Sequence, residues 1–436
     1  MSMRERLVKG VVMGKWEREY SQGIIDREAT MECASQVTRQ AYPDADCVYV
    51  DDYTVCEYRP DGTSITWSDG YMKVLTEKGK RYRGNMSFPF TQPYMEVKLT
   101  SLEVIGVDGQ VRQCDTTAQS KTVLGDAHVL GDTFAPGSRI LRVRMPSVNI
   151  GDVIRVVTRH EILKPLVSNA WSHCQALRSV APIRHAVYEV HAPTEEPLRR
   201  MALKDIAAGT VVHRRFECQS GIIYRWELAN VPSLCSERDG SGLRAGVQRL
   251  VVSTLSDWQT ISRWYWRLCL PHLDATTPEL DAKVAEVTKH APGQEEKAEA
   301  IFSWVSRQVQ YTGMATDDEA PGWEPRDAAA TFRDRCGLCR DKAALLVSML
   351  RRAGCDAYPA LVTSHPWDDT DVPHLCFNHV IVAVRADRGR YDLVDCTHAD
   401  GERPLRTCLT TRGYLIAHPD GETLRTSSPT GGKENG

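Results

Sequence analysis

The stretch RDRCGLCRDKAALLVSMLRRAG, residues 333–354, places two cysteines directly before an apolar helical segment. Apolar residues recur at helical spacing after Cys339, and Gly354 is a residue type that commonly ends a helix. Three interpretations of the cysteines compete: half of a zinc site, a redox pair, or a nucleophile held at a helix terminus. The rest of the chain has to distinguish them.

Cys336 and Cys339 form a C-x-x-C motif. A closed zinc site needs a second pair of ligands at comparable spacing. The remaining candidates in this region lack the spacing of a known finger or ribbon: Cys355, Cys376, Cys396 and His398. A thioredoxin-type pair lies between a first strand and its helix, whereas helices and a long loop precede this one. Both interpretations are disfavoured, so we expect no metal and no cofactor.

The nucleophile interpretation uses more of the surroundings. Cys339 would lie in the first turn of the helix, where unpaired N–H groups and the helix dipole favour an anion. This position lowers the pKa of a thiol and supplies thiolate, the reactive form. The same N–H groups can bind a developing oxyanion. Apolar residues further along would anchor the helix in a core: Ala343, Leu345, Leu346, Met349 and Leu350.

A thiolate nucleophile works with an imidazole, which a third group usually orients. His379 lies in FNHVIVAV, residues 377–384, a segment with strand alternation, and Asp395 lies in DLVDCTH, residues 392–398. Adjacent antiparallel strands would bring both side chains to one end of a sheet, opposite the helix terminus. A single strand histidine is more often a core residue, and a single aspartate more often caps a turn. Neither residue is persuasive alone.

Composition excludes several classes of protein. The chain has 436 residues, 42% hydrophobic and 25% charged residues and a formal net charge of −3, as in soluble multidomain proteins. It shows no basic stripe and no apolar run of about 18 residues, so we expect neither a nucleic-acid partner nor a membrane span. The first thirty residues lack a secretory apolar region, which predicts a cytoplasmic protein. Most of the fourteen cysteines are expected to be reduced and buried.

The spacing of apolar residues changes along the chain. Alternating segments separated by Asp-Gly turns predict a β-sandwich, and after residue 250 helical periods dominate before strands return. The predicted fold class is a multidomain chain, an antiparallel β-sandwich followed by an α+β domain. The predicted parts are a helical lead-in over 1–40, a β-sandwich over 41–250, an α+β domain over 251–425 and a disordered tail over 426–436.

The motifs resemble a known family. RCGLCRDKAALLVSMLRRAGCDAYPALV (335–362), FNHVIVAV and YDLVDCT (391–397) resemble a bacterial transglutaminase-like domain of the papain-like cysteine enzyme superfamily. Upstream, YPDADCVYVDDYTVCEYRPDGT (42–63) and NIGDVIRVV (149–157) resemble the uncharacterised β-sandwich domain that commonly precedes such domains. The resemblance implies a papain-like catalytic domain behind a β-sandwich.

By this resemblance, Cys339 is the nucleophile, His379 the base and Asp395 its orienting acid. Tyr311 matches the family's aromatic residue near the catalytic helix, and Trp323 lies in the loop before the nucleophile. The loops that would line the cleft also include Trp367, Asp368 and Asp369, with a solvated surface loop as the alternative. The sequence departs from the family pattern at two positions, which are Leu338 before the nucleophile and Cys396 after the acid. Family members usually carry a secretory leader, so a trimmed leader is the alternative to a cytoplasmic location.

The resemblance implies a cysteine-dependent acyl-transfer enzyme that acts on amide or ester bonds through a thioester. Hydrolysis, as by a peptidase or amidase, is the favoured outcome, with a peptide or another amide as substrate. Amide formation by a transglutaminase-type acyltransferase is the first alternative. A non-enzymatic scaffold, with the β-sandwich binding a protein partner, is the second.

Overall fold

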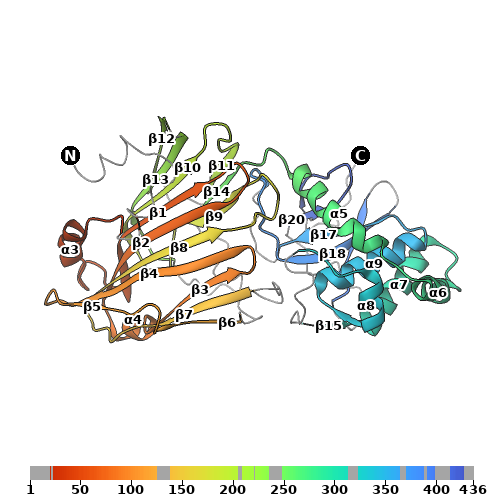
Figure 1. Ribbon diagram of the computed structural model, residues 1–436, viewed down its shortest axis with the longest axis horizontal. Coiled ribbons are helices and arrows are strands. Elements are labelled where there is room, and N and C mark those ends of the chain that lie inside the picture. The colour runs from red at the N-terminus through yellow and green to blue at the C-terminus, as the bar shows by residue number, and fades with distance from the viewer. Residues whose placement is uncertain are drawn as a thin grey trace, which may run out of the picture. The chain divides into compact units, whose positions relative to one another are not determined.

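The computed structural model describes residues 20, 23–124, 138–204, 209–219, 221–234, 248–312, 323–363, 370–386, 390–397 and 413–426. The described residues form two compact units, the first running to Thr254 and the second beginning at Leu255 (Figure 1). The predicted linker around residues 236–246 and nearly all of the predicted tail lie outside the described residues. The predicted domain limits therefore stay a prediction.

The first unit is built on an eight-stranded sheet with the strand order β12-β13-β10-β1-β2-β8-β4-β5. Its neighbouring strands are antiparallel, except that β1 and β10 run parallel. This pair differs from the all-antiparallel sheet that we predicted, because parallel neighbours need a long crossover that local turn signals do not reveal. The strands are β1 Cys47–Tyr58, β2 Ser64–Val74, β4 Met95–Ile105, β5 Val111–Gln113, β8 Val153–Ile162, β10 Ile183–Ala192, β12 Val211–Cys218 and β13 Gly221–Val231.

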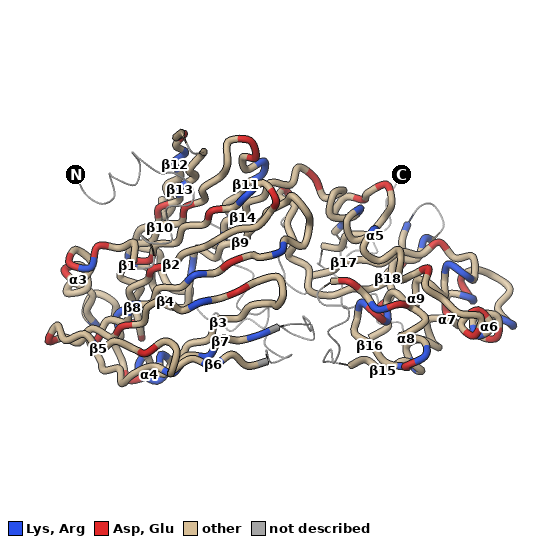
Figure 2. The backbone as a smooth tube through the Cα atoms, in the orientation of Figure 1, with Lys and Arg blue, Asp and Glu red and all other residues tan. Residues whose placement is uncertain are grey.

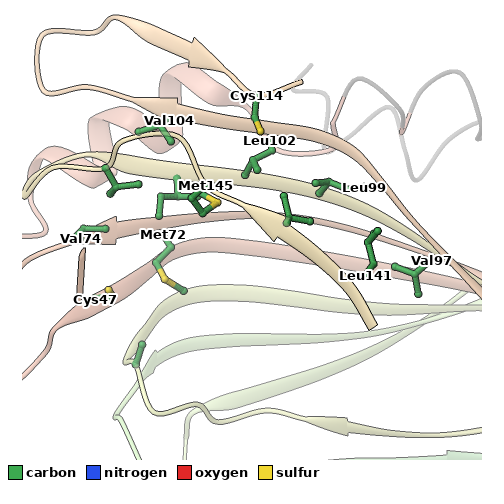
Figure 3. Close-up of a cluster of buried hydrophobic side chains, with 14 of the residues drawn as sticks. Cys47, Met72, Val74, Val97, Leu99, Leu102, Val104, Cys114, Leu141 and Met145 are labelled. Carbon is green, nitrogen blue, oxygen red and sulfur yellow. The ribbon is translucent and has the colours of Figure 1, made fainter. Parts of the chain in front are cut away.

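Two three-stranded sheets pack their apolar side chains against this sheet. The predicted β-sandwich therefore has the eight-stranded sheet as one layer and the two small sheets together as the other. In the core beneath the β3-β7-β6 sheet, Leu141 of β7 belongs to the same buried cluster as Met72 and Leu102 of the large sheet (Figure 3). Beneath the β11-β14-β9 sheet, Leu250 packs with Trp226. The strands are β3 Asn85–Thr91, β6 Ser120–Leu124, β7 Ser138–Arg144, β9 Ser172–Ala176, β11 Arg200–Lys204 and β14 Arg249–Ser253.

A short helix also packs on the large sheet. Helix α3, Arg27–Ser35, buries Ala34 against Val48 and Val50 of β1. These β1 residues alternate with Cys47 of the first core, so the helix covers the opposite face. A second short helix, α4 Glu77–Tyr82, follows β2. Helix α3 lies within the predicted helical lead-in, but residues 1–19 lie outside the described part, so the lead-in as a whole stays a prediction.

The second unit combines helices with a five-stranded antiparallel sheet of order β19-β18-β17-β20-β21. Helix α9 packs against β17 and β18 (Figure 1). A short parallel pair, β15 and β16, adjoins its start. The helices are α5 Trp258–Asp274, α6 Pro278–Thr288, α7 Gln294–Gln308, α8 Ala328–Asp334 and α9 Cys339–Arg352. The strands are β15 Gln310–Tyr311, β16 Cys336–Gly337, β17 Ala357–Val362, β18 His379–Arg385, β19 Tyr391–Val394, β20 Gly413–Ile416 and β21 Arg425–Thr426.

Helix α9 is the centre of this unit. Every residue from Cys339 to Leu350 is buried, the charged ones included. Gly354 follows the helix with φ +84°, a conformation that glycine adopts without strain. The predicted helix and its end are therefore confirmed.

The surface features agree with the composition. Lys and Arg are interspersed with Asp and Glu along the described elements of each unit (Figure 2). Among the described helices, none has the length and apolar character needed to cross a bilayer.

Candidate active site

The chain enters α9 through a tightly held turn. Leu338 is the extended N-cap residue, and Cys339 is the first residue of the helix. The buried carboxylate of Asp341 accepts hydrogen bonds from the N–H of Leu338 and the N–H of Arg326, both at 2.9 Å. One side chain thus fixes the start of the helix and the loop before α8. This leaves Cys339 held rigidly at the helix terminus.

Gly337 allows this turn to close. A Cβ at this position would lie 2.8 Å from the Cβ of Asp341, a separation that real side chains do not adopt. Gly337 also pairs with Tyr311 in the β15–β16 ladder, and its carbonyl accepts the N–H of Thr312 at 3.0 Å. The glycine two residues before the thiol therefore serves close packing, not a special backbone angle.

The predicted histidine and aspartate lie together with the thiol. His379 is the first residue of β18, and its Nε2 lies 2.8 Å from Oδ2 of Asp395. His379 also forms a side-chain hydrogen bond with Cys339. Because Nε2 is engaged by Asp395, the other ring nitrogen, Nδ1, is the one available to the thiol. The structure thus brings Cys339, His379 and Asp395 into one connected chain.

Asp395 lies one residue beyond the end of β19, not inside a strand as the sequence suggested. Its Oδ1 accepts hydrogen bonds from the N–H of Thr397 at 2.9 Å and from its hydroxyl at 2.7 Å. Both carboxylate oxygens therefore have partners. This turn aims the second oxygen at His379 and stabilises the charged carboxylate.

The electrostatics favour an ion pair. Burial alone would raise the pKa of the Cys339 thiol, but the hydrogen bond and charge of His379 and the N–H of Val380 bring it below its usual value. Burial alone would lower the pKa of His379, yet Asp395 and the thiolate raise it to about 10. The same hydrogen bonds hold the pKa of Asp395 at about 2 against burial. These shifts keep His379 as imidazolium and Asp395 as carboxylate at neutral pH, and they favour the thiolate form of Cys339.

Neighbouring cysteines behave differently. Burial raises the pKa values of Cys269 and Cys396 to about 12, so both are protonated thiols at neutral pH. Cys336, the other cysteine of the C-x-x-C motif, is half-buried and forms no disulfide. In the described part of the chain, no group of His, Cys, Asp and Glu is arranged to hold a metal ion.

The predicted aromatic residues lie close by. Tyr311 pairs with Gly337, two residues before the thiol. The ring of Trp323 lies edge-on to Tyr265 of α5, with centroids 6.2 Å apart, and the Tyr265 phenol interacts electrostatically with Cys339. The sequence offered no signal for Tyr265, because the helices α6, α7 and α8 separate it from the thiol along the chain. The three other cleft-loop candidates, Trp367, Asp368 and Asp369, lie outside the described residues.

Two segments of the chain match models of known protein families. Residues 60–234 match the model of a domain of unknown function with solved structures, DUF3857, and residues 281–396 match the transglutaminase-like superfamily. The chain carries a DUF3857 domain followed by a transglutaminase-like domain. The resemblance seen in the sequence is thereby confirmed, and the transglutaminase-like domain contains Cys339, His379 and Asp395.

A solved structure of low sequence identity shares this fold. An inferred protease from Parabacteroides distasonis is 17% identical, with a TM-score of 0.69 over 88% of this chain and 72% of the other. This likeness supports the fold. An inferred cysteine protease from Cytophaga hutchinsonii also matches, at 16% identity over 52% of this chain and 74% of the other, with a TM-score of 0.24. No curated protein is similar enough to match.

Proposed function

We propose that this protein is a cysteine-dependent acyl-transfer enzyme that cleaves amide bonds through a thioester, with Cys339, His379 and Asp395 as its catalytic triad. The observation that supports the proposal is the connected chain of hydrogen bonds from the thiol through His379 to Asp395, placed at the start of a buried helix. This arrangement supplies a thiolate and a proton donor side by side. A peptide is the substrate class that we favour.

The chemistry follows from the geometry. The Cys339 thiolate attacks the amide carbonyl carbon, forming a C–S bond and a tetrahedral oxyanion. Backbone N–H groups at the start of a helix, where Cys339 lies, can stabilise such an oxyanion. The His379 imidazolium then gives its proton to the leaving nitrogen as the C–N bond breaks. Asp395 holds the ring and stabilises its charged form throughout.

The thioester is resolved by a second nucleophile. Neutral His379 takes a proton from water, the hydroxide attacks the thioester, and the acid product leaves as the thiolate is restored. An amine in place of water would form a new amide by the same steps. We propose hydrolysis because water is always present, whereas an amine acceptor would need a binding site of its own.

The decisive experiment labels the full chain with a thiol-directed electrophile at mildly acidic pH and locates the adduct by mass spectrometry. We expect modification at Cys339, with Cys269 and Cys396 unmodified because their thiols are protonated. The Cys339→Ala variant is the matched control. Labelling spread evenly over the cysteines would contradict the proposal.

A second measurement separates the two outcomes of the thioester. A peptide library is incubated with the enzyme, with and without a tagged primary amine, and the products are identified by mass. New carboxyl termini indicate hydrolysis, and tagged products indicate transamidation. If Cys339 is labelled but neither product forms, the scaffold alternative gains support.

A further inference from the structure

Strand β12 forms a long edge of the eight-stranded sheet. It lies at one end of the strand order, with β13 as its neighbour (Figure 1). Its eight residues, Val211–Cys218, pair with β13 without a register shift and include no proline, whereas β5 at the other edge has three residues. Proteins commonly shorten, bulge or interrupt such edges, because a regular edge can pair with another strand. β12 is therefore a candidate site for strand addition.

The backbone of β12 alternates between its two sides. The N–H of Ala229 donates to the carbonyl oxygen of Thr210 at 3.2 Å, so the even-numbered residues that follow, 212 to 218, are those bonded to β13. The N–H and C=O groups that point away from β13 belong to Val211, His213, Arg215 and Glu217. Among the described residues, none forms a backbone hydrogen bond with these four. The edge thus offers a row of backbone donors and acceptors.

The side chains along this edge are largely exposed. Val212, His213, Arg214 and Arg215 form a continuous exposed run. The ring of His213 stacks on Trp226 of the sandwich core, with centroids 4.8 Å apart. Because side chains alternate along a strand, Val212 and Arg214 lie on the opposite face. An added strand would therefore meet exposed side chains on both faces of the edge.

The charges of the edge favour an acidic occupant. Arg214 forms an ion pair with Glu227 at 3.6 Å, and Arg215 forms one with Glu217 at 2.7 Å. Both arginine side chains are about half exposed, at 58% and 46%. Exposed ion pairs contribute little to stability, so exchanging a carboxylate of the chain for one of a partner costs little. The two guanidinium groups can therefore bind adjacent acidic residues of an added strand.

A second copy of the same edge is a poorer fit. If two β12 strands paired antiparallel with all four outward-bonding residues matched, Arg214 would lie opposite Arg214 of the second copy. Like charges directly opposite each other destabilise a strand pair. A partner with an acidic residue at that position replaces the repulsion with an attraction.

We propose that the free edge of β12 binds an extended acidic segment of another polypeptide, which adds to the large sheet as a further strand. The outward backbone groups would supply the hydrogen bonds, and Arg214 and Arg215 would select adjacent acidic residues. The inference goes beyond the proposed function, because the edge belongs to the first unit and Cys339 to the second.

The test measures binding of fluorescent peptides to the full chain by anisotropy. The probe is the blocked peptide Thr-Val-Glu-Glu-Thr-Val-Thr, whose glutamates face Arg215 and Arg214 when it pairs antiparallel with β12. One control peptide has lysine in place of both glutamates. The other is N-methylated at both glutamates, which blocks an N–H on each edge of the peptide and keeps its charge. We expect saturable binding of the probe and binding about tenfold weaker or less for either control.

Two variants of His213 isolate the backbone of the edge. His213→Pro removes an outward N–H without touching the bonds to β13, at a type of position where edge strands tolerate proline. His213→Ala also removes the ring but keeps the N–H. We expect the probe to bind about fivefold more weakly to His213→Pro than to His213→Ala. Thermal melts report the fold of both variants, and the peptide controls on the wild type decide the matter if His213→Pro does not fold.

The Cys339→Ala variant should bind the probe as tightly as the wild type does. Weaker binding to Cys339→Ala would place the probe at the candidate active site and overturn the inference. Equal affinity for the N-methylated and unmodified probes would also overturn it, because the backbone would then play no part. A wild-type dimer that becomes monomeric as His213→Pro in sedimentation analysis would show that a second copy occupies the edge, against the inference. None of these outcomes contradicts the proposed function.

Discussion

Nε2 of His379 lies 2.8 Å from Oδ2 of Asp395, a hydrogen bond between two residues 16 positions apart. The bond joins the first residue of β18 to the residue that follows β19, at the end of this antiparallel pair away from the connection between the strands, and it orients the imidazole ring. Because Thr397 occupies Oδ1 of Asp395, Oδ2 is the oxygen that holds the ring, which also forms a hydrogen bond with Cys339. The first two predictions depend on this relationship.

His379→Ala and Asp395→Asn should impair catalysis unequally. Loss of the imidazole removes the proton donor for the leaving amine, and general acid–base catalysis contributes on the order of 10² to 10⁴-fold. An amide at position 395 can still hold the ring but stabilises the imidazolium poorly, so we expect a smaller loss. Steady-state kcat/KM on a peptide substrate checks the order, with Cys339→Ala as the inactive reference. A larger loss in Asp395→Asn than in His379→Ala would contradict the assigned roles.

The ion pair should stabilise the fold within a defined pH range. The pKa of Asp395 is about 2 in the folded chain, against 3.8 for a free side chain. Its contribution to the free energy of unfolding is therefore fully present above pH 3.8 and is lost as the pH falls through about 2. The pKa of His379 is about 10 in the folded chain, against 6.5 for a free side chain. Its contribution to the free energy of unfolding is therefore fully present below pH 6.5 and is lost as the pH rises through about 10. Both stabilising contributions are fully present between pH 3.8 and pH 6.5.

This pH window can be checked by denaturant unfolding of the wild type and two variants. The difference in the free energy of unfolding between wild type and Asp395→Asn should shrink toward pH 2. The difference between wild type and His379→Ala should shrink toward pH 10. Differences that stay constant across the whole pH range would show that neither group titrates as described.

Cys336→Ser should leave activity and metal content unchanged. Cys336 lies on the β16 side of the turn, outside α9, and forms no disulfide. A zinc site or a redox pair would need both cysteines of the motif, whereas a nucleophile needs Cys339 alone. Activity assays and elemental analysis of the purified variant check this expectation. Stoichiometric zinc that is lost in Cys336→Ser would restore the zinc interpretation.

Gly337→Ala should destabilise the protein by about 1–3 kcal/mol, because overpacking a tight core forces its neighbours apart. The added methyl would press on Asp341, whose carboxylate fixes the start of α9, so activity should fall as well. Urea unfolding and kcat/KM check both effects. Gly70→Ala in β2 is the control, since a Cβ there meets only ordinary contacts, the nearest at 3.6 Å. Equal losses in both variants would refute the packing argument.

Limited proteolysis should cut the native chain near residues 235–250. This segment, which includes SERDGSGLRAG, is rich in glycine and serine and joins the two predicted domains. The fragments, identified by mass spectrometry, should correspond to the β-sandwich and to the transglutaminase-like domain. Cleavage confined to residues 50–230 would place the boundary elsewhere.

The local pattern of the sequence determined the secondary structure and the candidate residues. Helical spacing after Cys339 and glycine at 354 identified α9, and alternation around His379 identified β18. These features depend on residues within one or two turns of each other. Motif order along the chain was enough to select Cys339, His379 and Asp395.

Tertiary structure alone decided what surrounds those residues. The parallel pairing of β1 with β10, the phenol of Tyr265 near the thiol and the contact of Lys342 with Val309 join segments far apart in the chain. No local periodicity encodes such contacts, because they arise when separate elements pack and exclude water. The pKa of a thiol and the partner of a buried lysine are set by that packing, so they emerge only in the folded chain.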